Sequence, residues 1–270
     1  MIKYIVHLSD LHVRTTQLHE HYKKQFKIFL KEINEELVEK RGLSVDEIRF
    51  ALTGDIVHQK INISNEQMLL ISWFFKEITK IGKLIIIPGN HDFLENNMER
   101  VDSITPIVKL LNNDRISYYK DSGVYSDDNI NWVVYSLYQH NQRPEYVREN
   151  DKLYVGLFHS PVQGLSTDLG FTFDNAYDKL NFVNCDIVLC GDIHKRTAFP
   201  IPNGGKGIMI GSFLQMDFAE TVKHHGYGLF NIDEDEYTFH DLPNEQPYLH
   251  FTINDINDIE NEKELLVNFG

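Results

Sequence analysis

Hydrophobic runs alternate with amphipathic stretches along the first 111 residues, which predicts strands and helices in alternation. Short apolar runs that are typical of buried strands lie at Ile2–Leu8, Ile48–Thr53 and Leu84–Ile87. Between them, apolar residues recur at helical spacing over His21–Arg41, and Ser64 with Gln67 forms a capping box for a helix that reaches about Ile81. A further helix is expected over Met98–Leu111, where Pro106 could kink or restart it.

The remainder of the chain is rich in strand patterns. The expected strands are Tyr118–Tyr125, Trp132–Leu137, Leu153–Phe158, Ile187–Cys190, Thr197–Ile201, Gly207–Ile210, Tyr227–Ile232 and Tyr237–Leu242. A β-α-β-α-β opening followed by strands predicts an α/β fold in which two mixed β-sheets pack together and helices flank them. No linker divides the chain before Pro243, so we expect one domain over 1–243 and a short acidic tail over 244–270.

Composition narrows the function classes. Of 270 residues, 42% are hydrophobic and 24% charged, the balance of a globular protein, and no apolar run approaches the ~18 residues of a membrane span. The net charge of −14 means that attraction to nucleic acid cannot rest on overall charge. The two cysteines, Cys185 and Cys190, lie in one apolar run and are expected to be free buried thiols, which fits a reducing compartment.

Polar residues that could bind metal follow five of the predicted strands. They are Ser9–His12, Gly54–His58, Gly89–Asp92, His159 and Gly191–His194. Ligands in α/β folds collect outside the carboxyl ends of strands, so these segments could converge. Each segment alone is more often a turn or a surface histidine, Gly89–Asp92 excepted, but five together favour a metal site. Carboxylate, imidazole and amide ligands suit Mn, Fe or Zn, and one Asp bridging two cations would make a centre that hydrolyses phosphate esters.

This ordered set resembles the calcineurin-like metallophosphoesterase superfamily over roughly residues 1–240. Within it, the chain is similar to the meiotic recombination eleven and SbcD nucleases, including phage and viral members, because His58 lies three residues after Asp55 and because the third segment reads Gly-Asn-His-Asp. Protein phosphatases of the superfamily have Gly-Asp-x-x-Asp-Arg and Gly-Asn-His-Glu there. The segment from Gly211 to Gly226 also resembles these nucleases. The chain departs from them at Asp192, where the family usually has histidine, and in its absent or truncated DNA-facing capping domain.

The resemblance implies a four-layer αββα sandwich and a role for each site residue. One metal would take Asp10, His12, Asp55 and His194. The other would take Asp55, Asn90, His159 and Asp192, with Asp55 bridging the two. His91 would stabilise the reacting phosphate or protonate the leaving oxygen, Asp92 would orient the His91 ring, and His58 would position the phosphate. The cofactors implied are two divalent cations, Mn²⁺ first and Mg²⁺ second.

The resemblance also implies an activity and partners. The leading hypothesis is a Mn-dependent DNA nuclease of DNA repair and recombination, a 3′-to-5′ exonuclease on duplex ends and an endonuclease on single strands. It would act with an SbcC/Rad-fifty-like coiled-coil ATPase, in the cytoplasm or at the nucleoid. The alternative is a small-molecule phosphodiesterase or phosphatase with the same dinuclear centre, which the −14 charge and the missing cap favour. A scaffold with a decayed site is a third hypothesis, against which the complete ligand set argues.

Two further expectations concern other residues. The helix over 64–81 carries more apolar side chains than one core-facing stripe needs, and this excess predicts a homodimer through the early helices. Those side chains are Met68, Leu69, Leu70, Ile71, Trp73, Phe74, Phe75 and Ile78. Near the ligands, Arg14, Lys195 and Arg196 could contact phosphate, and His224-His225 could flank the metal pocket, although a structural role is favoured for that pair.

Overall fold

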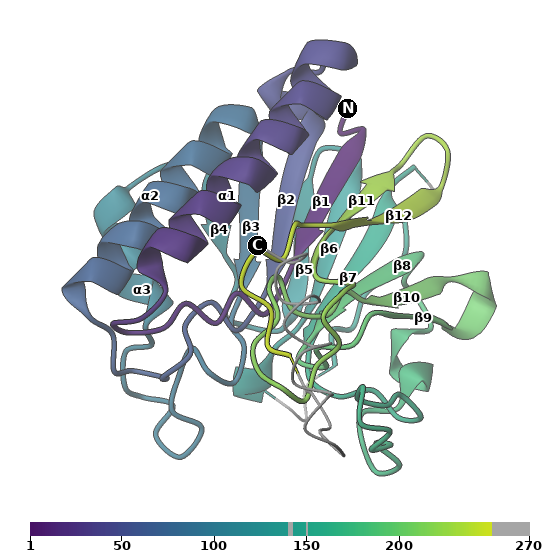
Figure 1. Ribbon diagram of the computed structural model, residues 1–270. Helices are drawn as coiled ribbons and strands as arrows, with labels where there is room; N and C mark the ends of the chain where they lie inside the picture. The colour runs from purple at the N-terminus through teal and green to yellow at the C-terminus, as the bar shows by residue number, and fades with distance from the viewer. Residues whose placement is uncertain (140–142, 150, 250–270) are drawn as a thin grey trace, which may run out of the picture.

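The computed structural model describes residues 1–139, 143–149 and 151–249, which form two packed six-stranded sheets (Figure 1). The first sheet has the order β12-β11-β1-β2-β3-β4 and the second the order β5-β6-β7-β8-β10-β9. Strands of the first are β1 (Tyr4–Leu8), β2 (Ile48–Thr53), β3 (Lys83–Ile87), β4 (Ile116–Tyr118), β11 (Gly226–Asn231) and β12 (Glu236–Asp241). Strands of the second are β5 (Gly123–Asp127), β6 (Ile130–Tyr135), β7 (Leu153–His159), β8 (Ile187–Gly191), β9 (Thr197–Pro200) and β10 (Lys206–Met209). In the first sheet β1, β2, β3 and β4 are parallel, and β11 and β12 add to the β1 side by antiparallel pairing. In the second sheet the parallel strands β6, β7, β8 and β10 lie between antiparallel β5 and β9, so both sheets are mixed as predicted.

The α-helices of the described residues cover the outer face of the first sheet (Figure 1). They are α1 (His19–Ile33), which continues as a π-helix over Asn34–Lys40, α2 (Asn65–Ile81) and α3 (Ile104–Leu111). The predicted capping box is present at α2, where the Gln67 N–H donates to Ser64 Oγ at 3.1 Å. Residues 160–186, with a 3₁₀ turn at Lys179–Phe182, cover the outer face of the second sheet.

Alternating side chains along each strand build three core layers. On β2, Ile48, Phe50 and Leu52 pack against the helices, while Ala51 faces the other sheet. Trp132 on β6 is fully buried between the sheets, and the next residue, Val133, packs against the outer loops. Period-two alternation with both faces apolar is expected where a sheet is covered on both sides.

Two predicted elements differ from the structure. The expected strand over 118–125 is two strands, β4 and β5, in different sheets, because the chain crosses from one sheet to the other between Tyr118 and Gly123. The helix expected from Met98 begins only at Ile104. There the buried Asp102 carboxylate accepts the N–H groups of Ile104 and Thr105, at 2.9 and 2.6 Å. Pro106 sits in the first turn, where the missing N–H has no intrahelical partner to lose.

The apolar excess on α2 does not form a free surface. Most of these side chains are buried in the core below the helices, and Met68 and Trp73 pack partly against that core. Leu69 alone among the eight is largely exposed, at 71%. The premise of the dimer prediction is therefore wrong, because α2 packs against both α1 and α3 as well as against the sheet. The dimer itself stays a prediction.

The structure also shows the two cysteines and the start of the expected tail. Cys185 and Cys190 are buried and free. No helix within the described ranges is long and apolar enough to span a bilayer. The start of the expected tail packs back on the domain, since Asn244 and the Tyr248 N–H both donate to Gln215 Oε1 at 2.9 Å. Residues 250–270 of that tail lie outside the described residues.

An ion pair joins the two sheets. Arg49 of β2 is 2% exposed, and its Nε and Nη2 donate to the two carboxylate oxygens of Asp127 of β5 at 2.6 and 2.8 Å. The second amino group of Arg49 donates to the backbone oxygen of Asp46 at 2.9 Å. Burial raises the pKa of Asp127, but the Arg49 guanidinium outweighs burial and holds that pKa below its ordinary value of 3.8.

We expect Asp127→Asn to lower the free energy of unfolding at pH 7 by about 3 kcal/mol, because it leaves the Arg49 charge buried without a partner. A carboxyl whose pKa is depressed on folding stabilises the protein above its ordinary pKa, and this contribution is lost as the pH falls below about 4. The difference between wild type and variant in urea denaturation should therefore shrink from pH 7 to pH 3. Asp128→Asn is the matched control, since Asp128 pairs with the exposed N-terminus and should matter much less. Equal effects of both changes would contradict the prediction.

Candidate metal centre

The segments that follow β1 and β2 run side by side and bring their ligands together. The Asp10 N–H donates to Gly54 O at 3.1 Å, and the His12 N–H donates to Asp55 O at 2.9 Å. Asp10, His12 and Asp55 have positive φ angles of 50°, 44° and 51°. A left-handed backbone conformation is uncommon for residues other than glycine, and the residues that adopt it cluster at functional sites. The local backbone is therefore held in a strained form that turns these three side chains toward one point.

The first predicted ligand set converges as expected. Nε2 of His12 lies 3.4 Å from Asp55 Oδ2, 3.8 Å from Asp10 Oδ1 and 3.1 Å from Nε2 of His194. Nε2 of His194 in turn lies 3.6 Å from Asp10 Oδ1. Four ligand atoms from three strand ends thus surround one position, which fits a divalent cation.

The second predicted set converges on the other side of Asp55. Nε2 of His159 lies 3.3 Å from Asp55 Oδ1, 3.7 Å from Asp192 Oδ1 and 3.2 Å from Asn90 Oδ1. The Asn90 side-chain oxygen is also 3.2 Å from both Asp55 carboxylate oxygens, so it faces atoms that accept hydrogen bonds. A cation would interact favourably with all of these oxygens at once. Without a cation, they gain a hydrogen-bond donor only if the Asn90 side-chain amide is rotated so that its NH₂ group faces them. The residues present therefore fit two divalent metal ions that share Asp55.

Burial of the carboxylates shapes the electrostatics. Asp10 is fully buried and Asp55 is 2% exposed. Burial raises the pKa of each, but the charges and hydrogen bonds of nearby histidines outweigh it and lower both pKa values. Burial lowers the pKa of His12 to about 3, so this ring is neutral and its Nε2 lone pair is free to bind metal. Burial also lowers the pKa of His159, but the charges of Asp55, Asp10 and Asp192 raise it to about 10 overall. A proton on His159 thus offsets part of the negative charge that cations would otherwise offset.

Hydrogen bonds behind the ligands fix their orientation. Nδ1–H of His159 donates to Thr53 O at 2.6 Å, which points Nε2 at the centre. Nδ1–H of His194 donates to Glu220 Oε1 at 2.5 Å, and the other Glu220 oxygen accepts from Ser212 Oγ at 2.9 Å. Such partners set the tautomer and raise the basicity of a ligating histidine. Sequence reasoning assigned Glu220 no role, because it lies 26 residues from His194; its one signal was its place in the family-like segment after Gly211.

Two glycines beside the ligands leave no room for a side chain. A Cβ at Gly89 would lie 2.2 Å from Asp55 Oδ1, and a Cβ at Gly191 would lie 1.9 Å from Ser9 Oγ. Both glycines therefore permit the close approach of neighbouring strand ends that the ligand geometry requires.

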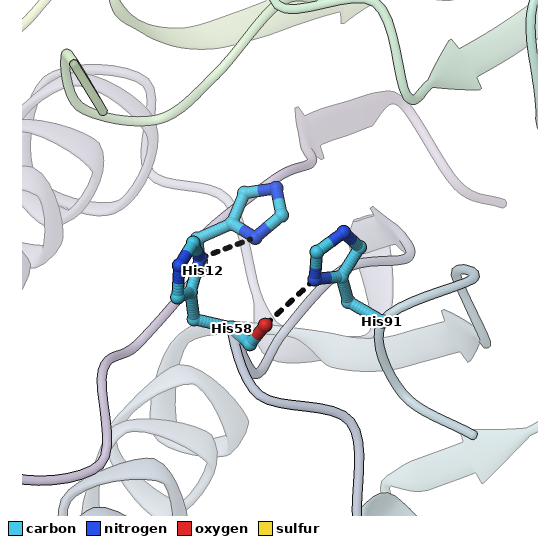
Figure 2. Close-up of side chains that lie close together, drawn as sticks. All are labelled: His12, His58 and His91. Carbon is cyan, nitrogen blue, oxygen red and sulfur yellow. Dashed lines mark hydrogen bonds between the residues drawn. The ribbon is translucent and has the colours of Figure 1, made fainter. Parts of the chain in front are cut away.

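His12, His58 and His91 lie close together (Figure 2). Nδ1 of His58 is 3.4 Å from Nδ1 of His12, and Nδ1–H of His91 donates to the backbone oxygen of His58 at 2.7 Å. The His91 ring is thus oriented with Nε2 left for substrate. The family resemblance assigns contact with phosphate to His58 and His91, and this role stays a prediction.

Asp92 does not orient the His91 ring, contrary to the expectation. Its buried carboxylate accepts the backbone N–H groups of Ile56, Val57 and Gly89, at 2.9, 3.1 and 2.8 Å. Burial and the nearby charge of Asp55 raise the pKa of Asp92 to about 8, although the Gly89 and Val57 N–H groups oppose that rise. Asp92 therefore ties the segment after β2 to the segment after β3, and the carbonyl of His58 takes the orienting role.

The other basic residues and histidines that were expected near the ligands differ in the contacts that they make. Arg14 donates to Met216 O at 2.9 Å, and Arg196 pairs with Asp241, so both guanidinium groups have partners within the protein. His225 contacts Ser212 Oγ at 2.9 Å and therefore supports Glu220 from behind, while His224 is exposed and lies 3.5 Å from Asp241. Lys195 lines a pocket next to His194.

Asp192 should act as a working metal ligand in place of the usual histidine. Its φ of 95° and the hydrogen bond from its N–H to Asp10 Oδ2, at 3.1 Å, hold its carboxylate beside His159. The carboxylates of Asp10, Asp55 and Asp192 carry a total charge of −3 against the +4 of two divalent cations. With histidine at position 192 the total ligand charge would be −2. We expect Asp192→Asn to weaken binding of the second metal and to cost far more activity than Asp192→His. Calorimetric Mn²⁺ titration and turnover would check this, and Asp192→Ala with both metals bound and most of the turnover would contradict it.

Glu220 should control affinity for the first metal. Loss of a carboxylate that orients a ligating histidine typically costs about 10–100-fold in metal affinity. We expect Glu220→Ala to weaken one of two Mn²⁺ binding steps by about that factor, and Glu220→Gln to weaken it less, since an amide oxygen still accepts from His194. Glu245→Ala, which removes an exposed ion pair with Lys24, is the control. Unchanged calorimetric titrations for Glu220→Ala would contradict this role.

Comparison with known proteins agrees with this geometry. Residues 3–196 match the calcineurin-like phosphoesterase family. An uncharacterized protein of Acanthamoeba polyphaga mimivirus is 31% identical over 261 residues, which cover 92% of this chain but 18% of that much longer protein. The crystal structure of Pseudomonas putida nuclease MPE is similar at a TM-score of 0.32 and 11% identity, over 86% of this chain and 85% of that one. The family match spans the segments that carry all seven predicted ligands, and the chain belongs to the calcineurin-like phosphoesterase family.

Proposed function

We propose that this chain is a two-metal phosphodiesterase that cleaves DNA. The observation that carries the proposal is the convergence of seven candidate ligands on two positions that share Asp55, with His58 and His91 beside them. Carboxylate, amide and imidazole ligands without thiolate suit Mn²⁺, with Mg²⁺ as the second candidate. Two divalent cations in such a centre activate water and polarise the phosphoryl oxygens of an ester.

The side chains around the centre would divide the remaining work. His91 keeps Nδ1–H on the carbonyl of His58, so a second proton on its Nε2 could pass to the leaving oxygen or stabilise the reacting phosphate. The neighbouring His58 ring would hold a non-bridging phosphate oxygen. Asp92 contributes indirectly, because it fixes the backbone on which both histidines are mounted.

His58 is the residue that favours a nuclease over a protein phosphatase, because the SbcD-like nucleases have histidine at this position. On that resemblance we propose 3′-to-5′ exonuclease activity on duplex ends and endonuclease activity on single strands. A homodimer and a coiled-coil ATPase partner belong to the same proposal. The net charge of −14 bears only on the second of these, because another copy of this chain would add negative charge. A partner would supply the positive field that holds a long polyanion.

A small-molecule phosphodiesterase or phosphatase is the second candidate. Of the three basic residues nearest the ligands, Arg196 is paired with Asp241, whereas Arg14 donates to a backbone oxygen and keeps its charge. Arg14 and Lys195 are few cations for the neighbouring phosphates of a long strand, which favours a short substrate. Parallel assays of labelled single- and double-stranded DNA, a cyclic nucleotide and bis-p-nitrophenyl phosphate with Mn²⁺ separate the two candidates.

His91→Ala tests the proposed mechanism. We expect it to lower kcat on DNA by about 10²–10⁴-fold while both metals stay bound, because general acid catalysis contributes about that much and His91 is outside the seven proposed ligands. The checks are single-turnover kinetics and metal analysis of the purified variant. His240→Ala, at a histidine that stacks on Tyr227, is the matched control. Near-normal cleavage by His91→Ala with two metals bound would overturn the mechanism, and cleavage of bis-p-nitrophenyl phosphate without cleavage of DNA would overturn the DNA substrate.

A further inference from the structure

A pocket adjoins the metal centre on the side of Asp192 and His194. Its volume is about 240 Å³, and it lies between residues 167–173, which come from the loop after β7, and residues 217–220. Asp192, His194 and Lys195 form its floor, so it opens directly onto the metal ligands. Ligand pockets for drug-sized molecules run from roughly 300 to 1,000 Å³, so this one suits a single small ring system.

The loop at the pocket is an ordered hairpin over residues 164–173. The Gly164 N–H donates to Phe173 O at 3.0 Å, and the Thr167 N–H donates to Phe171 O at 2.9 Å. The tip of the hairpin is tied to the opposite wall, because the Thr221 N–H donates to Asp168 Oδ2 at 3.1 Å. The pocket walls are therefore held in place before any ligand binds.

The hairpin presents apolar side chains that the fold does not cover. Leu169 is 77% exposed and Phe171 is 64% exposed. The Phe171 ring meets the Phe173 ring edge-to-face with 5.0 Å between centroids, and Phe173 and Leu169 both line the pocket. Exposed aromatic and aliphatic groups beside a site for phosphate esters offer a surface on which a flat base can stack.

The charges at the pocket select what enters it. Asp168, Asp217 and Glu220 line it and would repel a further phosphate, so the group that enters should carry no negative charge. The carboxylates of Asp168 and Asp217 can accept hydrogen bonds from the N–H groups at the edge of a base, whereas the two Glu220 oxygens already accept from His194 and Ser212. Lys195 makes no hydrogen bond or ion pair within the described part of the chain and can reach a phosphate on the adjoining nucleotide. A nucleotide has this combination of a neutral flat ring and an adjacent anion.

We propose that this pocket binds the base of the nucleotide next to the scissile phosphate, with Leu169 and Phe173 as its apolar wall and with Phe171 packed against Phe173. This inference rests on the proposed phosphodiesterase function and names its substrate class: a nucleotide diester with an unpaired base. A base held in a paired duplex cannot enter the pocket, so a duplex end must fray before its terminal nucleotide is cleaved.

The test compares two esters with the same leaving group. Thymidine 5′-(p-nitrophenyl phosphate) carries a base, and methyl p-nitrophenyl phosphate does not. Wild-type enzyme with Mn²⁺ should have a kcat/KM about tenfold or more higher for the thymidine ester. In Leu169→Ala and in Phe171→Ala the ratio of kcat/KM for the thymidine ester to that for the methyl ester should fall by about fivefold or more. Phe171→Tyr should keep the wild-type ratio. Leu110→Ala is the matched control, because Leu110 of α3 is 78% exposed, like Leu169, but lies on the helical side.

A second readout is independent of catalysis. In the Phe171→Trp variant without metal, thymidine should quench the added fluorescence saturably, whereas deoxyribose should not, with wild-type protein as the baseline. A thymidine-to-methyl ratio near one in wild type, or one that Leu169→Ala leaves unchanged, would overturn the pocket proposal. If wild type hydrolyses neither ester nor DNA, the proposed function fails, and the absence or presence of saturable quenching then decides the pocket by itself.

Discussion

The packing of three carboxylates into one buried site is the constraint on which the rest of the structure depends. Ligand atoms of Asp10, Asp55 and His159 lie within 4.8 Å of one another, and Asp192 lies 3.7 Å from the same histidine. Like charges in a buried site repel unless positive charge is placed among them. The charges of the surrounding carboxylates raise the pKa of His159, which favours a proton on this ring when no metal is bound. Two divalent cations would place more positive charge there, so metal binding would stabilise this edge of the fold.

The sandwich provides the geometry that this constraint demands. The carboxyl ends of β1, β2 and β3 from one sheet meet those of β7 and β8 from the other, so ligands distant in sequence approach without long loops. The strained backbone at Asp10, His12 and Asp55 is tolerated because the paired segments and the Asp92 carboxylate hold it from several directions. The core between the sheets and the Arg49–Asp127 ion pair hold the two sheets against each other.

The surroundings of the centre differ on its two sides. His58 and His91 form one side, with imidazole groups suited to contacting phosphate oxygens. The hairpin over 164–173 forms the other side, with exposed apolar side chains and acidic groups. This division fits the proposed substrate, whose charged ester would lie over the metals and whose base would lie to one side.

The sequence by itself determined the elements and the ligand list, and tertiary structure decided the supporting contacts. Apolar runs of strand length and the Asp, His and Asn residues that end them were visible locally, so β2, the α2 cap and the list of seven candidate ligands could be read from the sequence. The role of Glu220, the true partners of Asp92 and the burial of the apolar face of α2 were not, because each depends on residues far away in the chain. The crossing between β4 and β5 was also hidden, since both strands carry similar patterns and only their pairing assigns them to different sheets. Local pattern specifies which residues can act, whereas the packing of distant segments specifies which atoms they meet.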